Sequence, residues 1–284
     1  LSELALPMVK VGGAFLAMKA EDCTEEVETA ANARTVLGAP DAEVLHYTVP
    51  FDEVSRAIVR LQTCVPLRSW EAALGLDQIE EGEDSFRLGA MVTLGQLEGH
   101  DGLAAFTQGA MKEAVRHIVG TQFRNMATVG GSISGRFGFS DIWTLFLALD
   151  AQVELYKGGI VSLADFGQTG PGKDIVTHII IPKKACQTAY DSLRLNETDF
   201  PVIAVAVSAD AENVRCAIGA RPARAEVVRL PAADVRRQGL EGAAKQIAHS
   251  MTYESNMRGS ADYRQDMAVV LCRRLLAKVL GGDQ

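Results

Sequence analysis

The sequence predicts an α+β protein, in which an α/β region precedes an antiparallel sheet backed by two C-terminal helices. Strand-like segments rich in β-branched residues follow one another between 175 and 219, with turn residues at 210–213 between two of them. The segment 260–280 instead has apolar residues every four positions, which defines the buried stripe of a helix. Successive strands followed by helices favour a sheet that is covered by those helices.

Residues 1–63 predict a separate small βα segment. Thr24 is a suitable N-cap for a helix that runs to about Leu37, before glycine and proline residues that end helices. Strands are expected at 14–18, 43–49 and 54–61.

Residues 67–172 are expected to form the α/β region. A loop rich in Glu and Gly leads into a strand that ends near Leu94, and the apolar spacing predicts one continuous helix at 103–118. A hairpin is expected at 151–163, because the residues at 157–159 form a turn between two strand-like runs.

Residues 175–284 predict a C-terminal α+β domain. Its sheet is expected to begin with a strand at 175–181, and helices at 240–250 and 260–280 are expected to back it. The other expected strands cover 188–195, 202–209 and 214–219.

The composition argues against nucleic-acid and membrane partners. A net charge of −8 over 284 residues repels the phosphate backbone of nucleic acids. No apolar run approaches the ~18–20 residues of a membrane-spanning helix, and the first residues lack the basic region of a signal peptide. We therefore expect a cytoplasmic protein.

The cysteines and histidines do not cluster along the sequence. Five cysteines without a C-x-x-C pair do not predict a disulfide framework, a zinc site or an iron–sulfur cluster. The five histidines are equally dispersed. No metal site is expected on this chain.

Two adjacent glycines carry the strongest functional signal, in the run T-V-G-G-S-I at 128–133. Adjacent glycines let the backbone turn through positive φ, and they let an anionic ligand approach inward-pointing amide N–H groups. The alternative is a plain glycine turn at a hairpin or a helix–strand corner. Asp141 lies nine residues past Ser132 at the head of an apolar run, where its alternative role is that of a helix N-cap.

The sequence around these residues resembles a known family. The runs F-R-L-G-A-M-V-T-L at 86–94, Q-F-R-N-M-A-T-V-G-G-S-I at 122–133 and R-G-S-A-D-Y-R at 258–264 are similar to the FAD-binding medium subunit of molybdenum hydroxylases, the xanthine dehydrogenase and carbon monoxide dehydrogenase family. The resemblance covers about residues 67–280. It implies an FAD-binding, PCMH-like α/β subdomain before the antiparallel sheet, with FAD as the cofactor.

The resemblance also implies which residues contact the cofactor. The amide N–H groups of Gly130 and Gly131 are expected to bind the FAD diphosphate, and the hydroxyls of Thr128 and Ser132 are expected to add donors. The family often has Asn at position 132, so one amide contact is lost here.

Two further residues are expected at the cofactor. Asp141 is expected to accept hydrogen bonds from sugar hydroxyls of FAD, because a carboxylate beside a diphosphate is otherwise repelled. Phe200 follows a segment at 189–194 that resembles the family's strand pair over the flavin. Phe200 is expected to pack against the cofactor, and the alternative is a core aromatic at the start of a strand.

The implied function is electron transfer. No spacing suggests a nucleophile–base pair or paired carboxylates, so no catalytic residue is assigned, and in a flavoprotein the isoalloxazine performs the redox step. The resemblance implies an FAD-dependent oxidoreductase subunit that works with a molybdopterin-binding large subunit. It would receive electrons from an iron–sulfur small subunit and pass them to NAD or another acceptor. The alternative is a non-catalytic interaction subunit of such a complex that has lost FAD.

The first 63 residues resemble a different family. The runs at 4–19 and 56–59 are similar to the C-terminal part of the glucose-inhibited division B type of ribosomal RNA guanine-N7 methyltransferase. This part lacks the glycine-rich loop that would hold S-adenosylmethionine, so it carries no methyl-transfer site, and RNA modification is the third hypothesis. The V-G-G-A run at 11–14 differs from the A-G-G-T loop of the flavin family, which predicts a divergent or replaced first FAD subdomain.

Overall fold

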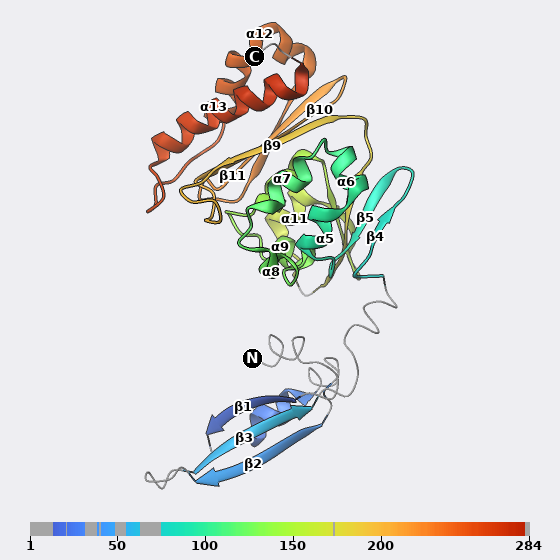
Figure 1. Ribbon diagram of the computed structural model, residues 1–284, viewed down its shortest axis with the longest axis vertical. Helices are drawn as coiled ribbons and strands as arrows, with labels where there is room; N and C mark the ends of the chain where they lie inside the picture. The colour runs from blue at the N-terminus through green and yellow to red at the C-terminus, as the bar shows by residue number, and fades with distance from the viewer. Residues whose placement is uncertain are drawn as a thin grey trace. The chain divides into compact units, whose positions relative to one another are not determined.

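The computed structural model in Figure 1 describes residues 14–20, 22–31, 39, 41–48, 55–62, 75–172 and 174–281. The chain divides into two compact units, Leu1–Gly75 and Leu76–Gln284, which are described separately. No helix among the described residues is both long enough and apolar enough to cross a membrane.

The N-terminal unit is a three-stranded antiparallel sheet in the order β1-β3-β2 with one helix. Val59 and Leu61 point to the same side of β3 and belong to its buried core. Thr24 is the first helical residue rather than the N-cap, which is Cys23, and the expected helix end at Leu37 lies outside the described residues. The elements are β1 (Ala14–Ala20), α2 (Thr24–Thr29), β2 (Ala42–Thr48) and β3 (Ser55–Gln62).

The C-terminal unit begins with a five-stranded antiparallel sheet in the order β4-β5-β8-β6-β7. The predicted hairpin is confirmed as β6 and β7. The prediction that the strand near 175–181 opens the C-terminal sheet is wrong, because this strand, β8, pairs with β5 and β6. The strands are β4 (Ile79–Glu81), β5 (Ser85–Gly89), β6 (Gln152–Leu155), β7 (Gly159–Ser162) and β8 (Val176–Pro182).

Short helices accompany this first sheet. The prediction of one continuous helix at 103–118 is wrong, because Gln108 and Gly109 have φ of 48° and 85° and separate α6 from α7. The helices are α5 (Leu94–Gly99), α6 (Asp101–Phe106), α7 (Ala110–Arg116), α8 (Thr121–Arg124), α9 (Val129–Ser134), α10 (Asp141–Ala148) and α11 (Leu163–Thr169).

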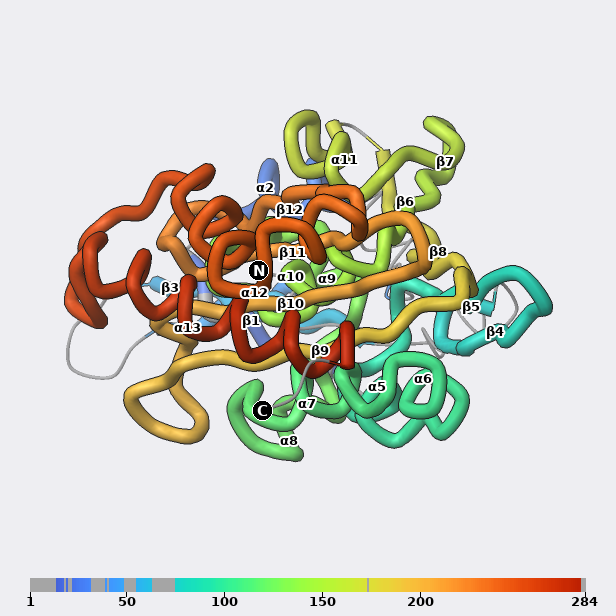
Figure 2. The backbone as a smooth tube through the Cα atoms, turned by 90° about the horizontal axis from the view of Figure 1, so that it is seen from above, coloured from blue at the N-terminus to red at the C-terminus, as the bar shows by residue number. Residues whose placement is uncertain are grey.

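A four-stranded antiparallel sheet in the order β12-β11-β10-β9 follows, and α12 and α13 lie side by side over it (Figures 1 and 2). The predicted antiparallel sheet with C-terminal helices is therefore confirmed. Helix α12 starts earlier than predicted and is interrupted by Gly239, whose φ is 76°. The elements are β9 (Gln187–Leu193), β10 (Ile203–Ala209), β11 (Asn213–Gly219), β12 (Glu226–Pro231), α12 (Ala232–His249) and α13 (Ala261–Leu280).

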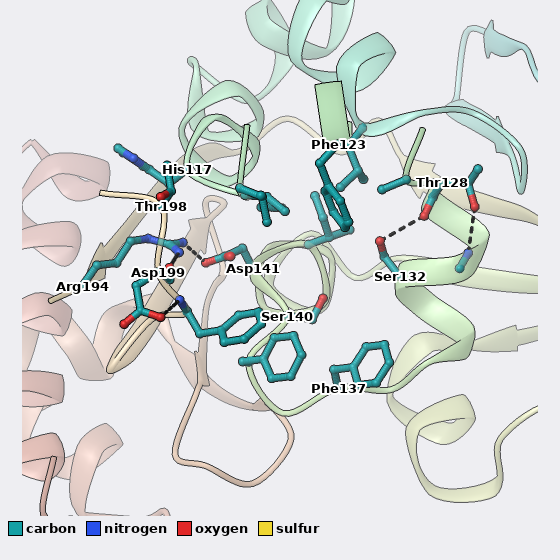
Figure 3. A pocket seen from close by; sticks show the side chains of 18 residues that line it. His117, Phe123, Thr128, Ser132, Phe137, Ser140, Asp141, Arg194, Thr198 and Asp199 are labelled. Carbon is teal, nitrogen blue, oxygen red and sulfur yellow. Dashed lines mark hydrogen bonds and ion pairs between the residues drawn. The ribbon is translucent and has the colours of Figure 1, made fainter. Parts of the chain in front are cut away.

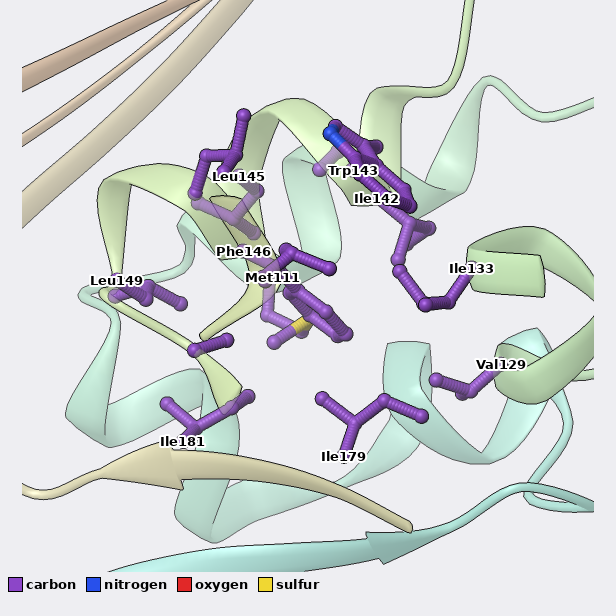
Figure 4. Close-up of a cluster of buried hydrophobic side chains, with 14 of the residues drawn as sticks. Met111, Val129, Ile133, Ile142, Trp143, Leu145, Phe146, Leu149, Ile179 and Ile181 are labelled. Atoms are coloured by element: carbon purple, nitrogen blue, oxygen red, sulfur yellow. The ribbon is translucent and has the colours of Figure 1, made fainter. Parts of the chain in front are cut away.

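Strand β10 joins the two cores of this unit. All seven of its residues are buried, because α13 covers one face of the strand and α10 packs on the other. Ala204 and Ala206 belong to the core of the first sheet, whereas Val205 and Val207 face the C-terminal helices. Figure 4 shows the first core, in which Ile179 and Ile181 of β8 lie beneath side chains of α9 and α10. Helices α9 and α10, which border the site described next, are therefore anchored in one core.

Candidate functional site

A cavity of about 410 Å³ opens in the C-terminal unit between α8, α9, the start of α10 and the loop that joins β9 to β10. Figure 3 shows Thr128 and Ser132 on one side of this cavity, with Arg194 and Asp199 on the other. Small-molecule sites commonly have a volume of this order and apolar walls with a few polar groups. Of the six predicted cofactor contacts, all except Gly130 line the cavity.

The paired glycines do not form the predicted positive-φ bend. They lie in the first turn of α9, which begins directly after Thr128, and neither glycine has a positive φ. Both amides have partners within the chain: the Gly130 N–H donates to the Ala90 carbonyl oxygen, after β5, at 2.8 Å, and the Gly131 N–H donates to the hydroxyl of the N-cap residue Thr128 at 3.2 Å. The predicted bend is therefore wrong.

The two glycines differ in what surrounds them. Gly130 is buried, and a Cβ placed there would lie 2.7 Å from both the Cβ and the carbonyl oxygen of Ala90. Gly131 is exposed at the cavity wall, and a Cβ there would meet only the Thr128 hydroxyl, at 3.1 Å. Gly130 thus lets α9 approach the chain after β5, while Gly131 leaves room in the cavity.

Thr128 is the N-cap of α9, since its hydroxyl accepts the Gly131 N–H. Thr128→Ala is expected to lower the free energy of unfolding by about 0.5–2 kcal/mol, because the Gly131 N–H loses its partner. Thr128→Ser keeps the oxygen and should stay close to the unsubstituted protein. Urea unfolding followed by circular dichroism measures both variants, and an equal loss in the two would contradict the capping role.

Asp141 is held in a buried polar cluster. Its Oδ1 accepts hydrogen bonds from the Tyr190 hydroxyl and from Nη2 of Arg194, and the side chains of Asp141 and Arg194 are 5% and 7% exposed. Burial raises the pKa of the Asp141 carboxyl, although the Arg194 guanidinium works in the opposite direction. The alternative role as an N-cap is wrong, because Ser140 caps α10 and Asp141 is its first helical residue.

Arg194 also holds the loop that carries Phe200. Its Nη1 donates to the Asp199 carbonyl oxygen at 2.5 Å, and its Nε donates to the Ser192 hydroxyl at 3.1 Å. The sequence indicates Arg194 only as part of the 189–194 motif and predicts no role for it. Its position at the end of that motif was the signal that marked it.

An aromatic row forms another wall of the cavity. The rings of Phe137 and Phe139 stack with centroids 5.2 Å apart, and Phe139 and Phe200 have centroids 4.1 Å apart. Phe200 is 44% exposed, so the alternative of a core aromatic is wrong. Phe137 and Phe139 were not predicted, although two phenylalanines in a glycine-containing loop are a signal of an exposed aromatic surface.

These walls fit the FAD ring system better than they fit its diphosphate. The aromatic row and the side chains of Ile118 and Phe123 offer flat apolar surface to a planar ring. The amides of Gly130 and Gly131 already have partners within the chain, so the predicted amide cradle is not free. The Thr128 and Ser132 hydroxyls remain at the opposite end of the cavity, where each can take a further hydrogen bond.

Comparisons with known proteins agree with this geometry. The model of the FAD-binding domain in molybdopterin dehydrogenase matches residues 15–184, and the model of the CO dehydrogenase flavoprotein C-terminal domain matches residues 188–279. The family resemblance, the fold and the cofactor expected from the sequence are thereby confirmed. The boundary predicted at 172–175 between two domains stays a prediction.

Relatives extend over most of the chain. YgfM of Escherichia coli K12 is 30% identical over 209 residues, which are 72% of this chain and 76% of that protein. The nicotine 6-hydroxylase medium subunit of Paenarthrobacter nicotinovorans is 29% identical over 258 residues, which cover 80% of this chain and 90% of the relative. The structure of reconstituted CO dehydrogenase from Oligotropha carboxidovorans superposes with a TM-score of 0.62 at 26% identity, over 73% of this chain and 79% of that chain.

The second resemblance is also found, over a much shorter length. Ribosomal RNA small subunit methyltransferase G of Bacillus cytotoxicus is 47% identical over 62 residues, which are 22% of this chain and 26% of the methyltransferase. The activity of that whole protein therefore does not carry over. Because the first family model matches more than half of the chain and YgfM is similar across most of it, the chain belongs to the family of FAD-binding domains in molybdopterin dehydrogenases.

Proposed function

We propose that this chain is the FAD-binding electron-transfer subunit of a cytoplasmic molybdenum hydroxylase. It would receive electrons from iron–sulfur clusters on a small subunit, beside a molybdopterin-binding large subunit, and pass them to NAD or another acceptor. The observation that carries the proposal is the aromatic-walled cavity in a chain of this family. The similarity to a nicotine 6-hydroxylase medium subunit supports the assignment to a multi-subunit enzyme.

The residues of the cavity would hold the cofactor in two ways. Phe139 and Phe200 would pack on the isoalloxazine, while Thr128 and Ser132 would give hydrogen bonds to the polar end of FAD. When bound, FAD supplies the redox chemistry. Closely packed side chains around the ring would exclude water.

Asp141 would orient the cofactor as a hydrogen-bond acceptor. Arg194 and Tyr190 occupy its Oδ1, so the remaining carboxylate oxygen is the one available to a ligand hydroxyl. Because both donors already hold the carboxylate in place, it need not reorganise when the ligand arrives.

A second candidate function is a non-catalytic interaction subunit that keeps the fold without FAD. The occupied amides of Gly130 and Gly131 favour it, because they remove the donors expected for the diphosphate. It predicts assembly with the same partners and no bound flavin.

Co-expression of the full chain with the large and small subunits separates the two functions. The proposed function predicts that the purified complex contains about one FAD per copy of this chain, by acid release and fluorescence. It also predicts that the substrate of the complex bleaches the flavin absorbance, because the substrate gives up two electrons as it becomes hydroxylated. A flavin-free complex would support the interaction subunit, and failure to assemble would contradict both.

A further inference from the structure

A small second cavity, of about 70 Å³, adjoins the aromatic row on its other side. Phe139 and Phe200 line both cavities, so the two spaces share a wall. Asn256, Arg258 and Arg264 are the polar residues of the small cavity, which we call the arginine cleft, and the rest of its lining is Pro201, Ala220 and Pro222. Its volume corresponds to roughly two water molecules, which is the scale of a single phosphate or carboxylate group.

Arg264 brings an unbalanced charge to the arginine cleft. The side chain is 1% exposed, and its guanidinium donates to the carbonyl oxygens of Val202, Glu254 and Gly259 and to the Asn256 amide oxygen. All of these acceptors are neutral. Within the described part of the chain, no carboxylate lies at ion-pair distance from Arg264, although buried charges are normally paired.

Arg258 adds a second guanidinium beside it. Its Nη2 and Nε donate to the Asp199 carboxylate at 3.0 and 3.4 Å, and its guanidinium lies 5.2 Å from the centre of the Phe200 ring. Burial lowers the pKa of Arg264, and the charge of the nearby Arg258 lowers it further. Asp199 pairs with Arg258 alone and Arg264 has only neutral acceptors, so the two guanidinium groups and the one carboxylate leave a net positive charge at the cleft.

The positive charge of the cleft lies directly beside Phe200, which also lines the larger cavity. Phe200 separates the cleft from the larger cavity, so a ligand whose ring lies on Phe200 can place an anionic substituent beside Arg258. Arginine is suited to oxyanions because its planar fork donates two parallel hydrogen bonds. Acceptors without an anionic group, such as dioxygen or a quinone, would gain nothing from the cleft.

We propose that the arginine cleft binds a phosphate-sized oxyanion next to Phe200. The source of the oxyanion is either a dinucleotide that exchanges electrons with the cofactor or the free anion. The dinucleotide source rests on the proposed function, whereas binding of the anion to the protein does not require FAD.

Two variants of the same ion pair test the site. Arg258→Gln removes a cation from the cleft, and Asp199→Asn removes the carboxylate that competes with the ligand for Arg258. Isothermal titration calorimetry with inorganic phosphate should give a Kd raised about tenfold or more by Arg258→Gln and lowered about threefold or more by Asp199→Asn. Arg258→Lys should retain part of the affinity.

The opposite shifts in the Kd for phosphate, up in Arg258→Gln and down in Asp199→Asn, distinguish an anion site from a purely structural ion pair. If Arg258 only held the loop at Asp199, both variants would loosen the loop and shift the Kd in the same direction. Arg237→Gln is the matched control, because it removes an arginine that is 80% exposed on α12 and should leave the Kd unchanged. Thermal unfolding of each variant confirms that the proteins compared are folded.

A second probe identifies the source of the anion. In the FAD-loaded complex, Arg258→Gln should raise the NADH concentration needed for half-maximal bleaching of the flavin about tenfold, while dithionite still bleaches it fully. An effect on phosphate alone supports the free anion as the ligand. No effect on either probe, or equal shifts in Arg258→Gln and Asp199→Asn, would overturn the site. Absence of FAD with phosphate binding intact would overturn only the proposed function.

Discussion

Gly130→Ala is expected to destabilise the C-terminal unit by about 1–3 kcal/mol, the cost of overpacking a dense core. The added methyl group would lie 2.7 Å from the Cβ and the carbonyl oxygen of Ala90, and backbone cannot move aside as a flexible side chain can. The shift would also strain the 2.8 Å hydrogen bond from the Gly130 N–H to the Ala90 carbonyl oxygen. Urea unfolding measured by circular dichroism gives the free energy.

Gly131→Ala is the matched variant with the opposite expectation. Its methyl group meets only the Thr128 hydroxyl, at 3.1 Å, and alanine is favoured over glycine in a helix by up to about 1 kcal/mol. Stability should therefore hold or rise slightly, while FAD affinity should fall because the methyl group enters the cavity. A stable Gly130→Ala protein, or a Gly131→Ala protein with undiminished FAD affinity, would contradict the assigned roles.

Arg194→Met is expected to lower the free energy of unfolding by about 3–5 kcal/mol, because it leaves the Asp141 carboxylate buried without a charged partner and with Tyr190 as its remaining side-chain donor. Asp141→Asn should also destabilise, since Arg194 would then be a buried cation without a charged partner. Denaturant unfolding of the two single variants and of the double variant gives the free energies for a double-mutant cycle, which measures the coupling between Asp141 and Arg194.

The double variant distinguishes a coupled pair from two independent residues. Because neither charge is then left alone, the double variant should lose clearly less than the sum of the single losses. Tyr190→Phe is the control, since it removes one donor to Asp141 and leaves the ion pair intact. Additive losses would mean that the ion pair does not stabilise the unit.

The local part of the fold was predictable from the sequence. Strands β10 and β11 are confirmed because β-branched residues and a turn between them mark strands, and helix α13 is confirmed because its apolar residues recur every four positions. Strand β12 was missed, since Arg229 and Glu226 hide its pattern at the edge of the sheet. The apolar pattern of a sequence therefore predicts buried strands and helices but misses an exposed edge strand.

Pairing between distant segments was not predictable. The strand near 175–181 has the same apolar pattern whichever sheet it joins, and its pairing with β5, about ninety residues earlier, is set by packing. The break between α6 and α7 depends on a positive φ at Gln108, a residue that usually avoids it.

The sequence predicted where the candidate site lies better than it predicted which groups in the site are free to bind a ligand. The glycine run did mark the cavity wall, but the same two glycines also fit the first turn of a helix, where their amides bond to Ala90 and Thr128. The contact of Asp141 with Arg194 joins residues 53 positions apart, so no local spacing indicates it. The aromatic row likewise forms only when the loop after β9 meets the loop before α10.

An experimental structure of the full chain crystallised with FAD tests the central claim, that the large cavity is the cofactor site. We predict FAD density that runs from Thr128 and Ser132 to the ring of Phe200, with a ligand hydroxyl at hydrogen-bond distance from the Asp141 carboxylate. Density elsewhere on the chain, or a cavity that stays free of FAD at saturating concentration, would contradict the account.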